Sequence, residues 1–251
     1  MLTEERFLQI KALVDRQGTA TVQELTERLA SSESTIRRDL NEMDRRGMLT
    51  KVHGGAVSRA EVSLMRDEAV ALREEQHGEE KQKIAACAAA LLEPGDFVYL
   101  DAGTTTERML DSLAAKEVAF VTNALALASR LARLGYKTLL LGGEVKTETE
   151  AVVGEDAVER LRSFHFSKGF FGANAVHSKY GYMTPDVREA AVKRAAMEQC
   201  AKRYVLADAS KFDKIAQVGF GDFEGATCIT TGAMALPAYR RCGNLLFVKE
   251  E

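Results

Sequence analysis

Apolar residues recur at helical spacing in three successive blocks near the start of the chain. Because residues three and four positions apart lie on one face of a helix, each block predicts a short amphipathic helix. Gly18 ends the first block, and Thr21 with Glu24 forms a capping-box pattern before the second. Ser32 or Ser34 can cap the third. The three apolar stripes are Phe7, Ile10, Leu13 and Val14; Val22, Leu25 and Leu29; and Ile36, Leu40 and Met43.

The connection between the second and third blocks is only about four residues long, 30–33, which suits a helix-turn-helix. After Gly47 the segment MLTKVHGGAV predicts two very short strands around a glycine turn, an arrangement known as a wing. Residues 1–57 therefore predict a winged helix-turn-helix domain.

The pattern changes twice beyond this domain. Residues 58–83 are rich in charge and poor in large apolar side chains, and they predict a partly helical linker that carries no site. From Ile84 onward, helical runs alternate with short apolar segments. Such alternation predicts a mostly parallel sheet covered on both faces, so residues 84–251 predict a Rossmann-like α/β domain. The strand candidates are DFVYL, VAFVT, KTLLLGG, KGFFGA, RYVLA and ATCIT.

Composition supports two domains and limits the classes of function. The chain has 251 residues, of which 46% are hydrophobic, enough for a sizeable core. Its 34 Lys and Arg against 37 Asp and Glu give a net charge of −3, so any DNA-binding surface must be local. The charged, amphipathic N-terminus and the absence of a long apolar run predict a soluble, cytoplasmic protein with no membrane contact. Four cysteines without CxxC spacing predict reduced thiols, and neither a metal site nor a cofactor is expected.

The candidate DNA-binding surface combines the third predicted helix with the wing. Polar side chains lie off the apolar stripe of that helix, where Arg can bond guanine edges or phosphates and hydroxyl groups can reach either. A solvated helix is the alternative, because the four Arg of residues 31–46 are balanced by four acids. The short turn before this helix and the basic wing after it favour DNA. The candidates are Ser34, Thr35, Arg37, Arg38, Lys51, His53 and Gly54.

The segment STIRRDLNEMDRRGMLTKVHGGAV resembles the signature of DeoR-family bacterial transcription regulators. In that family a winged helix-turn-helix carries T-[IV]-R-R-D-L, then a G-x-[LI] strand and an H-G-G-A wing. The resemblance implies that residues 33–46 form the recognition helix and that residues 51–55 contact the DNA backbone or a minor groove. Double-stranded operator DNA is the expected partner. Because paired recognition helices need two or more copies, we also expect a homo-oligomer, a dimer or a tetramer.

The stretch LDAGTTTERML, residues 100–110, follows a predicted strand and opens a helix. Gly103 allows close approach of a ligand, and Thr104, Thr105 and Thr106 add hydroxyl groups beside free N–H groups. This combination predicts an anion site, although a capped turn fits the same residues. The stretch lacks the GK[ST] of a Walker loop, so hydrolysis of nucleoside triphosphates is not indicated.

Polar residues at other strand ends support a ligand site, because open α/β sheets bind ligands at the carboxyl ends of their strands. The end of RYVLA adds Asp208 and Ser210. Glu189 and Lys193, four positions apart, fit an ordinary ion pair or a sugar-hydroxyl acceptor with a phosphate donor. The candidate effector residues are Asp101, Gly103, Thr104, Thr105, Thr106, Thr122, Asn123, Gly142, Gly143, Gly172, Asn174, Glu189, Lys193 and Lys211.

Residues 79–250 are similar to the effector domain of the same family, through motifs that include EEKQKIA, LDAGTTT, FFGAN, TPDVREAAVK and LADASKF. The resemblance implies a fold related to sugar-phosphate isomerases and a phosphorylated sugar as the signal. It is closest to repressors of fructose and lactose or tagatose operons, so fructose 1-phosphate or another ketose phosphate is the expected effector. GANAVHSKYGY departs from the family pattern, and we expect His177, Lys179 or Tyr180 to alter the choice of sugar.

Two other functions compete with this repressor hypothesis. An isomerase-like enzyme would use Asp101, Glu189 or Asp208 as base and Lys193 or Lys211 as electrophile. Such an enzyme has no use for a winged helix, and kinship of fold does not establish catalysis, so no catalytic residue is predicted. A DNA-binding assembly protein with an empty pocket would bind its operator whatever sugar phosphate is present.

Overall fold

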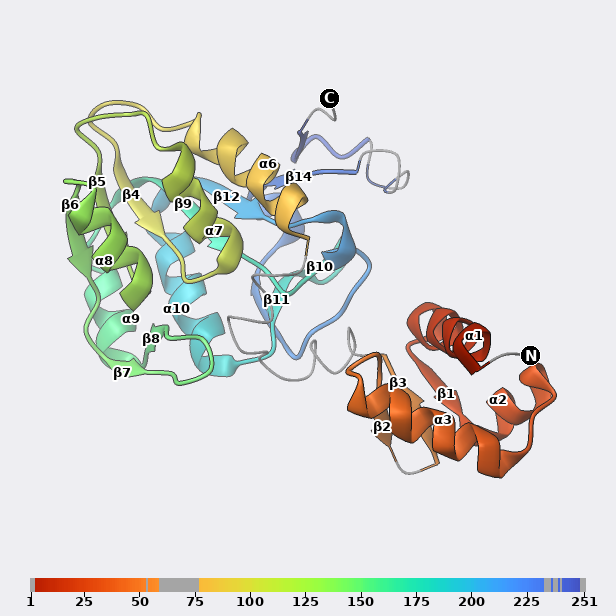
Figure 1. Cartoon of the computed structure of the whole chain (residues 1–251). Coiled ribbons are helices and arrows are strands. Elements are labelled where there is room, and N and C mark those ends of the chain that lie inside the picture. The colour runs from red at the N-terminus through yellow and green to blue at the C-terminus, as the bar shows by residue number, and fades with distance from the viewer. Residues whose placement is uncertain are drawn as a thin grey trace. The chain divides into compact units, whose positions relative to one another are not determined.

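The computed structural model describes residues 3–52, 54–58, 77–232, 236, 239 and 241–248. The chain divides into two compact units, Met1–Arg66 and Asp67–Glu251, which are described separately (Figure 1). No helix within the described ranges is long and apolar enough to cross a bilayer.

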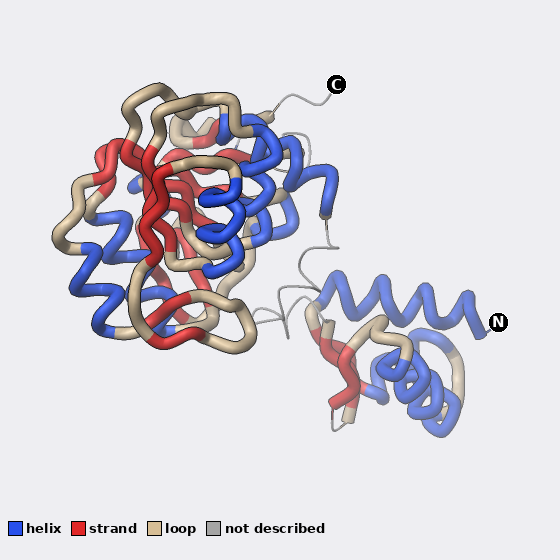
Figure 2. Tube along the Cα trace, turned by 60° about the vertical axis from the view of Figure 1, so that its left-hand side comes forward, coloured by secondary structure: helices blue, strands red, loops and turns tan. Residues whose placement is uncertain are grey.

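The first unit packs three helices against a small antiparallel sheet of strand order β1-β3-β2 (Figures 1 and 2). The three predicted apolar stripes form its core, in which only Leu13 of the predicted residues is partly exposed. The fold is therefore the predicted winged helix-turn-helix. Its elements are α1 Thr3–Gln17, β1 Thr19–Thr21, α2 Val22–Leu29, α3 Glu33–Arg45, β2 Thr50–Val52 and β3 Gly55–Val57.

Local hydrogen bonds fix both helices of the helix-turn-helix. The Thr21 side chain accepts a bond from the Glu24 N–H, and the Glu24 carboxylate accepts one from the Thr21 N–H, which is the predicted capping box. Ser32, rather than Ser34, caps α3 by accepting from the Thr35 N–H. The apolar pattern missed strand β1, whose three residues are too few to display alternation.

The glycine pair of the wing has two separate roles. Gly54 has φ of +87°, a left-handed conformation that glycine adopts without strain. A Cβ on Gly55 would lie 2.3 Å from the carbonyl oxygen of Ala20, so only glycine lets β3 lie against β1 at this point. The small sheet therefore requires the glycine pair of the H-G-G-A motif, which is part of the family resemblance.

The second unit is built on a seven-stranded sheet of order β15-β14-β12-β9-β4-β5-β6, and every neighbouring pair is parallel. All six predicted strand candidates are strands of this sheet, which confirms the expected Rossmann-like class; β15 was not predicted. The strands are β4 Phe97–Leu100, β5 Ala119–Thr122, β6 Lys137–Leu140, β9 Phe166–Gly172, β12 Cys200–Leu206, β14 Thr227–Thr230 and β15 Leu245–Phe247.

Helices cover both faces of this sheet (Figure 2). Ile84, Met109 and Leu127 belong to one buried cluster, and Leu161 and Ala190 belong to the cluster on the other face. Alternate strand residues point to opposite faces, which is why a parallel sheet has two cores. The helices are α6 Gly78–Ala89, α7 Thr104–Arg108, the 3-10 turn η1 Met109–Ser112 and α8 Leu125–Arg133 on the first face, with α9 Glu155–Leu161 and α10 Val187–Glu198 on the second.

Short elements complete the second unit. Two of them pair as an antiparallel ribbon between β6 and α9, and three form a small antiparallel sheet of order β10-β11-β13. They are β7 Glu144–Val145, β8 Val152–Val153, β10 Ala175–His177, β11 Gly181–Thr184, β13 Val218–Gly221 and the 3-10 turns η2 Ala209–Lys211 and η3 Phe223–Gly225.

Helix α6 begins within the predicted linker, residues 58–83. Residues 59–76 lie outside the described residues, and the last six residues of the predicted linker, 78–83, belong to α6. Lys81 is 4% exposed and lies one helical turn before Ile84, on the buried side of α6. The charged run GEEKQK is solvated on one face only, which a count of charges does not reveal.

The order of the strands determines where a ligand can bind. The chain passes from β4 to β5 and β6 on one side of the sheet and then returns to place β9 against the other side of β4. This reversal is a topological switch point, and the carboxyl ends of β4 and β9 flank it. The loops that follow these strands begin at Asp101 and Ala173.

The four thiols are free, as expected. Cys200 and Cys228 are buried, whereas Cys87 and Cys242 are partly exposed. Burial raises the pKa of Cys200 to about 12 and also raises the pKa of Cys87 and of Cys228. Burial of Cys87, Cys200 and Cys228 therefore favours the protonated thiol, which is the less nucleophilic form.

Candidate functional site

Most of the candidate DNA-binding residues lie on the solvent side of α3 and on the β2–β3 hairpin. Ser34, Arg37 and Arg38 are exposed on α3, and Thr35 is half-buried beside the cap. Lys51 and Gly54 are exposed on the hairpin, while His53 lies outside the described residues. The Lys51 N–H donates to Asp44 Oδ1 at 3.2 Å, which ties the hairpin to the last turn of α3.

Asp39, the acid of the TIRRDL motif, has a structural role. It is 3% exposed and accepts two hydrogen bonds from Arg6 of α1, one from Nε at 2.5 Å and one from Nη2 at 3.1 Å. These bonds raise the pKa of Arg6, against the opposing effect of burial. The bidentate pair fixes the orientation of α3 relative to α1, so Asp39 does not neutralise the arginines on the exposed face.

The exposed arginines of α3 fall into two groups. Arg37 pairs with Glu33 one turn earlier, Nη2 to Oε1 at 2.6 Å. Arg45 and Arg46 both bond Glu42 and hold the pKa of that carboxyl at about 2. Arg38 forms no ion pair or side-chain hydrogen bond with any residue that the structure describes. Among the four arginines of residues 31–46, Arg38 is therefore the one that pairs with no acid of the described residues.

In the second unit, one pocket lies at the carboxyl ends of β4, β9 and β12. Eight of the fourteen candidate effector residues line it, together with Lys81 of α6 and Asp208 after β12. The pocket thus joins five segments that are far apart in the sequence. The eight candidates are Gly103, Thr104, Thr105, Gly172, Asn174, Glu189, Lys193 and Lys211.

Asp101 lies beneath the pocket and orients one of its lysines. It is fully buried, and its Oδ2 accepts bonds from the Lys193 ammonium and from the Gly172 N–H, the latter at 3.0 Å. Burial raises the pKa of the Asp101 carboxyl, although the adjacent Lys193 opposes the rise. Lys193 also donates to the Gly172 carbonyl oxygen at 3.2 Å. The ammonium group is therefore held at the end of β9, facing the pocket.

Glu189 and Lys193 do not form the ordinary ion pair that their spacing suggested. Glu189 Oε1 accepts a bond from the Thr149 hydroxyl at 2.7 Å and lies 3.3 Å from the Lys146 ammonium. Lys146 also pairs with Asp186, the N-cap of α10, at 2.9 Å. The loop between β7 and β8 thereby holds the Glu189 carboxylate at the edge of the pocket.

Three further candidates shape the loop around the pocket and do not line it. The Thr106 hydroxyl donates to the carbonyl oxygens of Asp101 and Gly103 at 2.7 and 2.8 Å. Asn123 accepts bonds from the Tyr99 hydroxyl and the Ala102 N–H, and it donates to the Val152 carbonyl. The Thr122 hydroxyl accepts from the Ala124 N–H at 3.1 Å.

Two candidate glycines and the residues of the atypical segment lie elsewhere. Gly142 and Gly143 are exposed after β6, and a Cβ on Gly143 would lie 2.6 Å from the Val153 carbonyl oxygen, so this glycine allows β7 and β8 to pair. His177, Lys179 and Tyr180 belong to the β10–β11 hairpin, and the structure places none of them in the lining of the pocket.

Lys81 is the pocket residue that sequence reasoning missed. The charged neighbours of Lys81 favour a linker at this position. A signal existed in its position three and four residues before Ile84 and Ala85, on the apolar stripe of α6. Lys81, Lys193 and Lys211 give the lining three basic side chains. Its two acidic side chains are Glu189 and Asp208. Lys211 forms no ion pair with a described residue, so its charge is available to a ligand.

The chain matches two family models that together span most of its length. Residues 6–62 match the DeoR-like helix-turn-helix domain, and residues 76–233 match the DeoR C terminal sensor domain. The candidate DNA-binding residues fall within the first match, and the pocket falls within the second.

Two relatives match over almost the whole chain. The uncharacterized HTH-type transcriptional regulator FruR of Bacillus subtilis is 41% identical over 94% of both chains. The lactose phosphotransferase system repressor of Streptococcus mutans is 35% identical over 92% of both. Among solved structures, ribose 5-phosphate isomerase A of Methanocaldococcus jannaschii is 14% identical with a TM-score of 0.40 over 55% of each chain, a likeness too distant to bear on function.

Proposed function

We propose that this chain, which belongs to the DeoR family of transcription regulators, represses a sugar-utilisation operon in the cytoplasm. Its first unit binds double-stranded operator DNA. A phosphorylated sugar that binds in the second unit releases the protein from this DNA. The repressor role is supported by the similarity to lactose phosphotransferase system repressors. Fructose 1-phosphate, and then tagatose 6-phosphate or another ketose phosphate, are the ligands that the family resemblance favours.

The unpaired guanidinium of Arg38 supports the DNA-binding half of the proposal. Arg37, Arg45 and Arg46 must exchange an acidic partner for DNA, whereas Arg38 pairs with no acid in the part of the chain that the structure describes. A guanidinium on a helix of this motif can form two parallel bonds with guanine O6 and N7. We therefore assign base reading to Arg38 and contact with the DNA backbone to Lys51.

The three lysines that line the pocket support the effector half of the proposal. Lys81, Lys193 and Lys211 line the pocket beside Thr104 and Thr105, whose N–H groups lie in the first turn of α7 and have no acceptor within the helix. A phosphate group near neutral pH carries between one and two negative charges, and charge-assisted bonds to such donors are strong. Glu189 and Asp208 are acceptors suited to the hydroxyl groups of a sugar.

The positions of two of its three proposed bases disfavour the isomerase alternative. Asp101 lies below the pocket in an ion pair with Lys193 and is not among the lining residues. Glu189 is held by Thr149 and Lys146, so a role in positioning suits it better than the transfer of a proton. The relatives from Bacillus subtilis and Streptococcus mutans, which match over 94% and 92% of this chain, are a transcriptional regulator and a repressor by name.

Operator release and sugar binding in the full chain test the proposal. An operator selected from random duplexes should be bound tightly, and fructose 1-phosphate should weaken that binding. Isothermal titration should give micromolar affinity for a phosphorylated ketose and no heat for the free sugar. Thr105→Glu should abolish sugar-phosphate binding by repulsion and leave operator binding intact, whereas Ser163→Glu, which adds the same charge on an exposed residue, should change neither. Equal affinity for sugar and sugar phosphate contradicts a phosphate site.

The oligomeric state is a separate part of the proposal. Tight binding to a repeated or palindromic operator requires two recognition helices, so light scattering should give a dimer or a tetramer. A stable monomer that binds one half-site with full affinity would refute it.

A further inference from the structure

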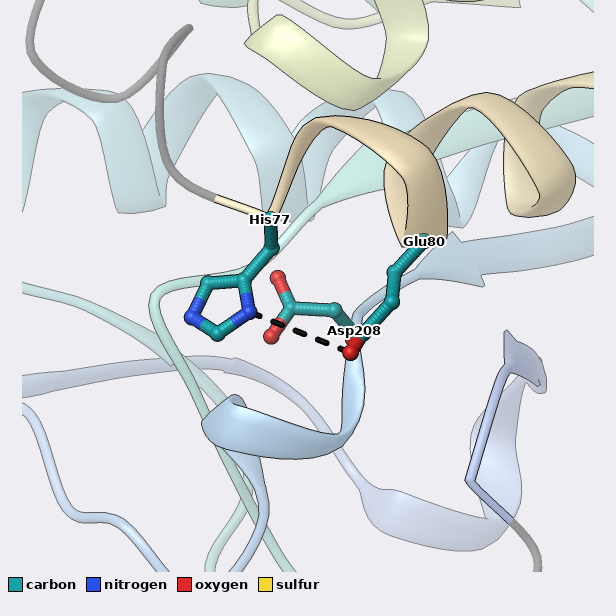
Figure 3. A group of neighbouring side chains, drawn as sticks. All are labelled: His77, Glu80 and Asp208. Atoms are coloured by element: carbon teal, nitrogen blue, oxygen red, sulfur yellow. Dashed lines mark ion pairs between the residues drawn. The ribbon is translucent and has the colours of Figure 1, made fainter.

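His77, Glu80 and Asp208 form a cluster at the edge of the effector pocket (Figure 3). His77 and Glu80 lie at the start of α6, and Asp208 lies in the turn after β12. His77 Nδ1 is 3.9 Å from Glu80 Oε1, and one ligand atom from each of the three side chains lies within 4.8 Å of the other two. Figure 3 shows the imidazole ring and the two carboxylates turned toward one another.

Both carboxylates are oriented by donors that occupy one oxygen each. Asp208 Oδ1 accepts bonds from the N–H and the hydroxyl of Ser210, and Glu80 Oε2 accepts one from the Thr231 hydroxyl at 3.3 Å. The second oxygen of each carboxylate remains for another partner. In protein metal sites, hydrogen bonds of this kind hold the carboxylate ligands in position.

Asp208 is a buried carboxylate that forms no ion pair with a described residue. The residue is 1% exposed, yet no lysine or arginine of the described residues forms an ion pair with it. Buried charges are normally paired or coordinate a metal, because removal of an isolated carboxylate from water is costly. The only potentially cationic side chain in the cluster is His77, and its contact is with Glu80.

We propose that His77, Glu80 and Asp208 bind one divalent transition-metal ion. One imidazole nitrogen and two carboxylate oxygens suit Mn²⁺ or Zn²⁺, whereas Mg²⁺ and Ca²⁺ prefer oxygen ligands alone. Three protein ligands leave at least one coordination position open. Asp208 also lines the effector pocket, so the ion joins the start of α6 to the wall of that pocket. His77 is the first described residue after the segment 59–76 that connects the two units in the sequence.

A titration of the full chain with Mn²⁺ tests the site. After treatment with a chelator, electron paramagnetic resonance should detect binding of one Mn²⁺ per chain at pH 7.5. His77→Gln and Glu80→Gln should each weaken this binding at least about tenfold. Loss of a residue that only hydrogen-bonds a metal ligand already lowers metal affinity by about this factor. His165→Gln and Glu79→Gln replace exposed residues of the same types outside the cluster and should leave the affinity unchanged. Mn²⁺ is the preferred probe because thiols favour Zn²⁺ over it.

The possible outcomes separate this proposal from the effector proposal. No Mn²⁺ binding, or equal affinity in His77→Gln and the parent, overturns the metal site. The titration contains no sugar, so a chain that binds Mn²⁺ and no phosphorylated sugar retains the metal site and loses the effector hypothesis. Circular dichroism of each variant identifies any loss of affinity that is due to unfolding.

Discussion

The two candidate binding regions use charged residues in opposite ways. The DNA-binding surface draws Arg38 and Lys51 from one short segment, and both side chains are exposed. The pocket draws Lys81, Lys193 and Lys211 from three distant segments, and the first two are 4% exposed. A buried charge needs a partner that compensates for the loss of water, and an exposed one does not. The pocket therefore depends on supporting residues that the DNA-binding surface does not require.

A buried ion pair nevertheless lies below each region. Arg6–Asp39 joins α1 to α3 below the DNA-binding surface, and neither residue is a candidate contact. Lys193–Asp101 lies below the pocket, and its lysine also lines it. The first pair only positions a helix, whereas the second combines support and recognition in one side chain. Substitutions should separate these two uses.

The largest effect should come from Asp39→Ala. It removes the carboxylate that forms a bidentate pair with the buried Arg6 guanidinium, and loss of one member of a buried ion pair typically costs about 3 to 5 kcal/mol. A unit of this size has few kcal/mol to lose, so α1 and α3 should separate and operator binding should be lost. Hydrogen exchange of the full chain should increase in residues 3–58 and stay unchanged in residues 77–232. Lys11→Ala, which breaks only the exposed pair with Asp15, is the control and should have little effect.

Lys193→Met should affect stability and recognition together. It leaves Asp101 buried without its cation, so we expect a loss of about 3 kcal/mol in the second unit and no binding of sugar phosphate. The double variant Asp101→Asn with Lys193→Met should regain stability, because the amide oxygen can still accept from the Gly172 N–H, but it should not regain binding. Recovery of both would mean that Lys193 only supports the loop.

The stability deficit of Lys193→Met should also depend on pH. Burial already raises the pKa of Asp101, and removal of the opposing lysine raises it further. A carboxyl with a higher pKa in the folded chain contributes stability that is present below its unfolded pKa and is lost as pH rises through the folded pKa. The deficit relative to the parent should therefore be smaller at pH 4 than at pH 7.5 in urea unfolding. A deficit independent of pH contradicts an ionised, unpaired Asp101.

The contrast between the regions also explains what the sequence could predict. In the first unit the apolar stripes, the capping box and the wing are local patterns, and the structure contains all of them. The sheet of the second unit followed equally well from its apolar runs. Strand β1 and the burial of Asp39 depend on partners elsewhere in the chain, so no local pattern indicates them.

The pocket was predictable only in part, for the same reason. Strand ends indicate which residues approach one another, because parallel strands share an edge. They do not distinguish Thr105, which lines the pocket, from Thr106, whose hydroxyl bonds the backbone. Nor does spacing reveal that Glu189 and Lys193 turn to separate partners. The cluster of His77, Glu80 and Asp208 joins residues more than a hundred positions apart, beyond any spacing rule.

A smaller effect should separate Arg38 from Arg37. Arg38→Ala should weaken operator binding by about 1 to 3 kcal/mol and relax the preference at one base pair. Arg37→Ala should cost less, because Arg37 already pairs with Glu33 and gains less from DNA. Binding titrations against the selected operator and its single-base variants provide the comparison. If the two substitutions cost the same, the unpaired state of Arg38 does not identify the residue that reads the base.

The smallest effect should come from Lys51→Ala. This variant tests whether an exposed charge of the wing contributes to DNA binding independently of the other charges. An exposed ammonium that contacts a phosphate releases about one counterion, so the slope of log affinity against log salt should fall in magnitude by about 0.9. Because a phosphate carries no sequence information, selected and random duplexes should weaken alike. The backbone bond from Lys51 to Asp44 persists in the variant, so the hairpin should keep its position. An unchanged salt slope would place Lys51 off the DNA, and a loss confined to the selected operator would make it a base-reading residue.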